Sequence, residues 1–180
     1  MRHWIWLLVV GFAGHWLRAE DYLSIEAAQA QFFGSDCQFQ VTSIPEEKAL
    51  SKAIKKQAGV ALHAERIRAW KALRDGKCVG WVFEDNVIGK HEFITYAVAV
   101  AVSGEVLDVA ILSYRETHGG EIMRPEWLAQ FKGKTVDQPF KIDVDIDGIS
   151  GATLSVRNVS DGVKKLLVLT QMELQDEQNR

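Results

Sequence analysis

The stretch Asp147–Thr153 (DGISGAT) holds the residues best suited to chemistry in this chain. The small residues Gly151 and Ala152 stand where a loop is expected to enter a helix that begins near Thr153. The first backbone N–H groups of a helix lack partners within it, and the helix dipole adds partial positive charge there. Such an end is suited to binding a phosphate. Hydroxyl groups accompany it at Ser150, Thr153 and Ser155. The same pattern is also typical of an ordinary helix N-terminus.

The acidic residues just upstream imitate the start of a calcium-binding EF-hand loop. They follow the spacing Asp143-x-Asp145-x-Asp147-Gly148. That loop needs a bidentate glutamate at its twelfth position, and the twelfth residue from Asp143 is Leu154. The flanking residues are also expected to form a strand instead of a helix. The sequence therefore predicts no metal site here.

Asp147–Thr153 resembles the flavinylation motif of the FMN-binding domain family. That family includes flavin subunits of the sodium-pumping NADH:quinone reductase and of the Rnf complex. The matching residues are Asp147, Ser150, Gly151, Ala152 and Thr153. The resemblance implies that FMN is held in phosphoester linkage by Thr153. It also implies a partner, a dedicated flavin transferase that uses FAD and magnesium to donate the FMN.

Two upstream segments extend the resemblance over roughly residues 76–169. The family's ETxG segment is matched by Glu116, Thr117 and Gly119, whereas His118 stands where several relatives have proline or another residue. The family's QFxGK stretch is matched by residues 130–134. The resemblance implies that Glu116, Thr117, His118 and Gly119 lie at the flavin. The alternative is a polar loop with a tight turn. His91, just before a long predicted strand, is either near the flavin or on a surface loop.

The first 19 residues resemble a secretory signal peptide. A basic start is followed by the apolar run Trp4–Ala13 and by the small residue Ala19 before a polar stretch. The alternative is a short anchor that is retained. Either interpretation predicts an extracytoplasmic location, in the periplasm or at the outer face of the inner membrane. Cleavage after Ala19 would remove Arg2 and Arg18 and change the net charge from −3 to −5.

Composition limits the classes of function. Apolar residues make up 47% of the 180 residues, enough for the core of about one domain. An acidic chain without a clustered Lys/Arg face is a poor nucleic-acid binder, because neutralisation of phosphates drives that binding. Cys37 and Cys78 fit no metal or haem spacing. They either form a disulfide or remain two small buried thiols.

Periodicity predicts helices first, then strands, then a final helix. Helices are expected at 25–33, after Ser24 as the N-cap, at about 49–59 and at about 60–73. Strands are expected at 78–84, 92–102, 106–113 and 140–144. A short helix is expected at 125–131, and the last helix from about 153. The predicted fold is α+β, with an antiparallel, hairpin-rich sheet packed against the N-terminal helices and one C-terminal helix.

The predicted organisation has four parts. Residues 1–19 are the signal peptide or anchor, 20–75 an N-terminal helical segment, 76–172 the FMN-binding domain and 173–180 a polar tail. The predicted function is an exported FMN-binding electron carrier that exchanges electrons with membrane or periplasmic redox proteins. No catalytic residue is assigned, so a stand-alone enzyme is less favoured. The alternatives are a flavin-dependent reductase of a small substrate, a noncovalent FMN-binding or sensor module, and a domain that has lost its flavin.

Overall fold

A computed structural model of the chain describes residues 22–174. The expectations for residues 1–19 and for the end of the tail therefore lie outside the described residues. The elements, in chain order, are α1 (Ile25–Phe33), β1 (Gln38–Thr42), α2 (Lys48–Ala58), η1 (Ala64–Arg66), β2 (Arg68–Arg74), β3 (Lys77–Ile88), β4 (Phe93–Ala101), β5 (Val106–Ser113), η2 (Gly120–Met123), α3 (Pro125–Leu128), η3 (Ala129–Phe131), α4 (Thr153–Leu169) and η4 (Thr170–Leu174).

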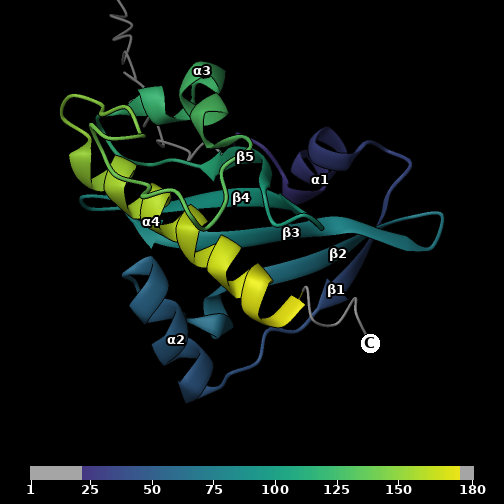
Figure 1. Cartoon of the computed structure of the whole chain (residues 1–180). Helices are drawn as coiled ribbons and strands as arrows, with labels where there is room; N and C mark the ends of the chain where they lie inside the picture. The colour runs from purple at the N-terminus through teal and green to yellow at the C-terminus, as the bar shows by residue number, and fades with distance from the viewer. Residues whose placement is uncertain (1–21, 175–180) are drawn as a thin grey trace, which may run out of the picture.

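The strands form one antiparallel five-stranded sheet in the order β1-β2-β3-β4-β5. Helix α4 runs diagonally across one face of the sheet, and α2 lies beside it (Figure 1). Helix α1 packs against the opposite face. This arrangement confirms the α+β fold that the sequence predicts.

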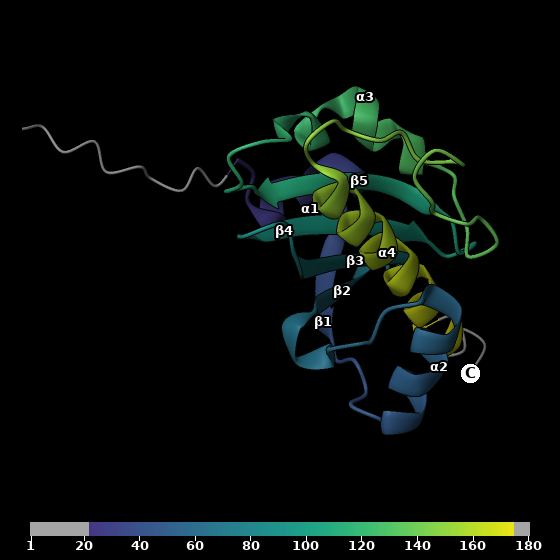
Figure 2. The same cartoon turned by 90° about the vertical axis from the view of Figure 1, so that its left-hand side faces the viewer.

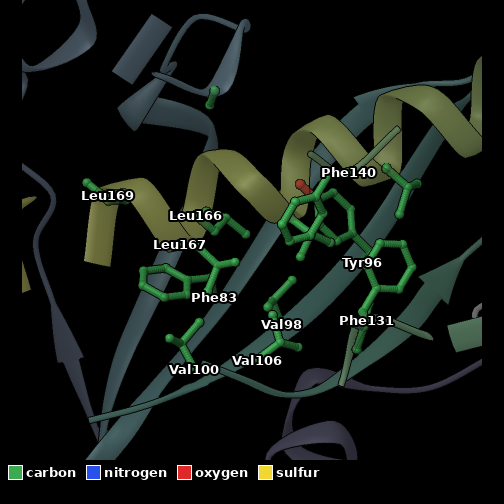
Figure 3. Close-up of a cluster of buried hydrophobic side chains, with 14 of the residues drawn as sticks. Phe83, Tyr96, Val98, Val100, Val106, Phe131, Phe140, Leu166, Leu167 and Leu169 are labelled. Atoms are coloured by element: carbon green, nitrogen blue, oxygen red, sulfur yellow. The ribbon is translucent and has the colours of Figure 1, made fainter. Parts of the chain in front are cut away.

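The two faces of β4 explain why helices pack on both sides of the sheet. Successive side chains of a strand point to opposite faces. The large side chains Ile94, Tyr96, Val98 and Val100 face α4 and belong to the main core. Figure 3 shows part of this core, in which Phe83, Val98 and Val106 lie beneath α4. On the other face Ala97 and Ala99 leave room for α1 to approach.

The predicted helix at 60–73 is wrong, and so is the expectation that residues 20–75 are a helical segment. Strand β2 lies there instead, between β1 and β3 in the sheet. Ile67 packs with the α4-side cluster, whereas Trp70 packs with the α1-side cluster, so their spacing of three does not mark one helix face. The sequence analysis also missed β1, a short edge strand whose residues are all exposed or half-buried.

The predicted strand at 140–144 is also wrong, because this segment forms a turn. Phe140 and Asp143 have positive φ angles of 56° and 63°, which no strand accommodates. The Asp145 carboxylate accepts hydrogen bonds from the backbone N–H groups of Phe140 (3.2 Å) and Lys141 (2.7 Å) and pairs with Lys134 Nζ at 2.9 Å. Asp145 thus provides acceptors for the backbone N–H groups of the turn, and no neighbouring strand is needed to pair with them.

The remaining predicted elements are confirmed. Helix α1 begins after Ser24, whose hydroxyl accepts from the Ala27 N–H at 3.2 Å. Strand β5 has the predicted bounds, and α4 begins at Thr153. Cys37 and Cys78 are both free thiols. Within residues 22–174 no helix combines the length and apolar character that a membrane crossing requires.

Candidate functional site

A cleft of about 420 Å³ lies at the N-terminal end of α4. Its volume falls within the range of roughly 300–1,000 Å³ that is usual for small-molecule sites. Three segments that are distant in the sequence line it: the β3–β4 turn, the loop after β5 and the start of α4. The lining residues are Lys90, His91, Glu116, Thr117, His118, Gly151, Ala152, Thr153, Leu154 and Ser155. Figure 2 shows the loops that follow β5 gathered around this end of α4.

The start of α4 presents backbone donors to the cleft. Ala152 is the N-cap residue and makes no side-chain capping bond, in contrast to Ser24 at α1. The first N–H groups of α4 therefore have neither an intrahelical partner nor a cap from residue 152. Thr153 is the first helical residue, and its side chain is exposed on the cleft wall. An exposed hydroxyl thus stands beside a cluster of partly positive donors.

Two of the three segments that carry the family resemblance meet in space at Gly119. A Cβ at Gly119 would overlap Ala152 Cβ and lie 2.9 Å from the Tyr114 hydroxyl. Gly119 also has a φ of 85°, a left-handed conformation that a residue with a side chain adopts at a cost. The loop after β5 therefore packs directly on the N-cap of α4, and this close approach requires glycine.

Tyr114 stabilises the same contact between the loop after β5 and the start of α4. It is 5% exposed, and its hydroxyl donates to the backbone carbonyl of His118. Burial raises the pKa of Tyr114; a hydrogen bond with Ser155 acts against this rise, and the charges of Glu116 and Glu121 add to it. Tyr114 is therefore protonated at neutral pH and keeps its hydrogen bond to the His118 carbonyl.

Glu116 holds the opposite wall of the cleft. Its carboxylate accepts the backbone N–H groups of His91 (2.6 Å) and Glu92 (3.0 Å) in the β3–β4 turn. A Cβ at Gly89 would collide with this carboxylate, so a side chain at residue 89 would displace the Glu116 carboxylate from the turn. Burial alone would raise the pKa of Glu116, but the N–H groups of Glu92, His91 and Lys90 outweigh it and lower the pKa.

Gln130 fixes the backbone that leads into α4. Its side-chain carbonyl accepts the Asp147 N–H at 2.6 Å, and its amide nitrogen donates to the Trp127 carbonyl at 2.7 Å. Trp127 Nε1 donates to the Asp147 carbonyl at 2.9 Å. Both hydrogen-bonding groups of the Asp147 backbone are therefore held by the segment around the QF pair.

The structure divides the DGISGAT stretch between two depressions. Gly151, Ala152 and Thr153 line the cleft together with Glu116, Thr117 and His118. Asp147 and Ser150 line a neighbouring depression of about 500 Å³ instead. That depression also contains Arg124, Glu121 and Trp127. Asp147 and Ser150 are thus brought near the cleft but not into it.

Some residues of the cleft were not singled out from the sequence. Lys90 lines the wall beside His91, which itself was left between a flavin role and a surface role. Gly89 and Tyr114 support the walls without lining them. A usable signal was the position of Gly89 and Lys90 between two strands of a hairpin. Among residues 22–174 no group of His, Cys, Asp and Glu side chains is arranged to hold a metal ion.

All residues that line the cleft fall within one match to a known family. Residues 89–168 match the model of the FMN-binding domain. This part of the chain is therefore similar to FMN-binding domains. The cofactor of this domain is FMN. The match begins at the β3–β4 turn and ends within α4, so it leaves out α1, β1, α2, β2 and β3.

Two known proteins resemble the chain over a larger part of its length. Over 113 residues the chain is 28% identical to a subunit of the ion-translocating oxidoreductase complex of Stutzerimonas stutzeri, an alignment covering 56% of this chain and 49% of that protein. The chain thus spans about half the length of this curated relative. The crystal structure of Shewanella oneidensis NqrC is 21% identical, with a TM-score of 0.47 and coverage of 75% of this chain and 70% of that chain.

The residues of the cleft fit FMN. A phosphate is matched by the uncapped start of α4, because the N–H groups and the helix dipole both favour an anion there. The cationic Lys90 lines the same cleft, and the carboxylate of Glu116 is already bound by backbone donors. Polar groups for the ribityl chain and the ring edge are present at Thr117, His118 and His91. Leu154, 44% exposed, offers an apolar surface at the rim.

Proposed function

We propose that this chain is an extracytoplasmic electron carrier whose FMN is bonded through its phosphate to Thr153. One observation carries the proposal. Thr153 places an exposed hydroxyl at the first position of α4, on the wall of the cleft, where Ala152 supplies no cap. When bound, FMN supplies one- and two-electron chemistry, and the protein supplies position and electrostatics.

Each wall of the cleft has a distinct part in this proposal. The start of α4 binds the phosphate through its backbone N–H groups. Thr117, His118 and His91 orient the polar edge of the cofactor. Glu116 acts through the β3–β4 turn, because its carboxylate already accepts two N–H groups there. Gly119 keeps the loop after β5 against Ala152.

Covalent attachment needs a second protein. The Thr153 hydroxyl oxygen forms the new bond to phosphorus, the pyrophosphate bond of FAD breaks, AMP leaves and the hydroxyl proton is released. We assign this step to a flavin transferase that uses FAD and magnesium. Asp147 and Ser150 lie on the surface next to the cleft, so they are placed for recognition by that transferase.

Location and partners rest on the N-terminus and on the relatives. The run Trp4–Ala13 favours export of the domain. The Stutzerimonas stutzeri relative is named as part of an ion-translocating oxidoreductase complex, which supports membrane redox proteins as partners. Electron-transfer contacts of this kind are small and transient.

The test is the intact mass of the chain purified from its own envelope fraction, with Thr153→Ala beside it. We expect an added mass of one FMN less one water, flavin fluorescence that survives denaturation, and loss of both in the variant. Thr42→Ala is the matched control, since it removes a threonine hydroxyl at the end of the edge strand β1, outside the cleft, and should keep the covalent flavin. An unmodified mass in cells shown to contain the transferase would contradict the covalent linkage. Noncovalent FMN binding would then be measured on the same protein.

A further inference from the structure

Helix α4 and the second half of β3 touch in a regular series of contacts that leads toward the flavin cleft. Lys165 Nζ pairs with Asp85 Oδ2 at 2.7 Å. One turn closer to the start of α4, a Cβ at Gly162 would lie 3.2 Å from Val87 Cγ1. Residues three or four apart share one face of a helix. Successive turns of α4 therefore follow β3 toward its last residue, where the β3–β4 turn begins.

Asn158 continues this series one turn before Gly162. Its side-chain nitrogen donates a hydrogen bond to the backbone carbonyl of Ile88, the last residue of β3, at 2.7 Å. One turn earlier again, Leu154 lines the flavin cleft together with Lys90 from the β3–β4 turn. Asn158 therefore joins helix and strand at the point next to the cleft.

The β3–β4 turn gains little stability from burial. The side chains of Lys90, His91 and Glu92 are exposed. At the two ends of the turn, Ile88 is 46% exposed and Phe93 is 54% exposed. A segment with few buried apolar contacts opens at a low free energy. The position of this turn therefore depends on the hydrogen bonds that it receives from other parts of the molecule.

Two side chains from different elements supply such bonds. Glu116, in the loop after β5, accepts two backbone N–H groups of the turn. Asn158, in α4, donates to the carbonyl of Ile88. Lys90 and His91 stand between these bonded groups and line the cleft. The bond from Asn158 therefore sets where the Lys90 and His91 wall stands relative to the start of α4.

We propose that Asn158 is a positioning residue for FMN, which holds the Lys90 and His91 wall of the cleft against α4 through the Ile88 carbonyl. Asn158 is not among the residues that line the cleft, so it acts on the cofactor through the turn. Without this bond the turn moves away from α4, and the contacts of Lys90 and His91 with FMN weaken. The proposal rests on FMN binding in the cleft and does not require the covalent bond to Thr153.

The test uses the full chain produced in cells without flavin transferase, titrated with FMN and followed by flavin fluorescence. Asn158→Ala should weaken FMN binding about fivefold, which corresponds to about 1 kcal/mol for one hydrogen bond. Asn158→Asp has nearly the same shape but no N–H donor, and should weaken binding at least as much. Lys164→Ala is the matched control and should leave the affinity unchanged, because Lys164 Nζ donates from the same helix to a different backbone carbonyl, that of Gln138, at 3.0 Å.

A double-mutant cycle and amide hydrogen exchange distinguish positioning from a general loss of structure. In a chain that already carries Lys90→Ala and His91→Ala, Asn158→Ala should cost little further FMN affinity, because the side chains that it positions are gone. Exchange at residues 89–92 should become about fivefold faster in Asn158→Ala and stay unchanged in Lys164→Ala.

Four results would overturn the proposal: equal FMN affinities of the Asn158→Ala and Lys164→Ala variants, additive losses in the cycle, unchanged exchange at residues 89–92 in a folded Asn158→Ala variant, or a wild-type chain that binds no FMN. An unmodified mass in the test of Thr153 is a separate result, since it concerns only the covalent linkage.

Discussion

The middle and the beginning of α4 place polar groups in opposite situations. In the middle, Lys165 is 5% exposed, and its Nζ contacts Asp85 Oδ2 at 2.7 Å. Tyr96, fully buried, donates its hydroxyl to the same oxygen at 2.6 Å. At the beginning, Thr153 is exposed and Ala152 provides no cap. One helix thus has a fully paired ionic centre and an N-terminus with free donors.

The buried centre specifies where α4 sits. Burial and the neighbouring Asp85 raise the pKa of Tyr96 far above its ordinary value, so the phenol remains a donor. A Cβ at Gly162 would collide with the Tyr96 hydroxyl, and glycine is therefore needed where α4 crosses β4. Moving the helix along the sheet would leave a buried charge unpaired, which is costly. The ion pair therefore holds α4 in register, and the N-terminus of α4 remains free to bind a cofactor.

The largest expected effect comes from breaking the paired centre. Lys165→Met leaves the Asp85 carboxylate buried without its cation, and we expect the free energy of unfolding to fall by about 3–5 kcal/mol. Urea denaturation followed by circular dichroism measures this loss. Lys164→Met is the control on the same helix, because Lys164 Nζ donates to the Gln138 carbonyl instead of a buried carboxylate. Equal losses in the two variants would show that the ion pair has no special part in placing α4.

The junction at the start of α4 gives the next largest effect. Gly119→Ala places a methyl group against Ala152 at a positive φ, so we expect a loss of about 2–3 kcal/mol together with reduced FMN content. Gly120→Ala is the matched control, since its Cβ would meet nothing closer than Met123 Cε at 3.5 Å. Thermal unfolding and the flavin absorbance per chain give both readouts. If Gly119→Ala behaves like Gly120→Ala, the two segments do not depend on this contact.

A smaller, pH-dependent effect is expected at Glu116. Its folded-state pKa is lowered, so the carboxylate stabilises the fold above its ordinary value of 4.5, and this contribution disappears as pH falls through the lower folded value. Glu116→Gln should therefore cost about 1–2 kcal/mol at pH 7 and progressively less toward pH 3. Urea denaturation across this pH range measures the difference. A difference that does not change with pH would mean that the charge is not what holds the β3–β4 turn.

The smallest effect concerns the cap that α1 has and α4 lacks. Ser24→Ala removes the bond to the Ala27 N–H and should lower stability by about 0.5–1 kcal/mol. The FMN content should be unchanged, because α1 lies on the opposite face of the sheet from the cleft. A measurable loss of flavin in this variant would contradict the separation of the two faces. Denaturation midpoints and absorbance spectra provide the check.

The spacing of apolar residues in the sequence correctly predicted the helices and strands whose buried side chains recur at regular helical or strand intervals. The buried face of α4 includes Val156, Val159, Val163 and Leu166, as its helical spacing indicates. The alternation along β4 likewise separated the large face from the alanine face. The prediction failed at β2, where Trp70 and Leu73 stand at helical spacing but belong to a strand, because pairing with β1 and β3 overrides spacing in so short a segment.

The sequence predicted which residue types form the candidate site. It did not predict that Asp147 and Ser150 lie in a neighbouring depression, outside the cleft. The residue types of DGISGAT and ETHG indicated a phosphate and a polar loop. The placement of Asp147 and Ser150 outside the cleft follows from the bonds between Gln130, Trp127 and the Asp147 backbone. Such long-range bonds have no local signature. The role of Glu116 as a support for the β3–β4 turn is hidden for the same reason.

The sequence by itself determined that α4 begins at Thr153, that small residues precede it, and that its inner face is apolar, since these depend on helix periodicity and on residues within one turn. Only the tertiary structure decided that the loop at Gly119 packs on Ala152 and that Lys165 is buried with Asp85. The physical reason is the distance along the chain between the residues in contact. Each of these contacts joins residues that are distant along the chain, and only the packing of the sheet against the helices brings them together.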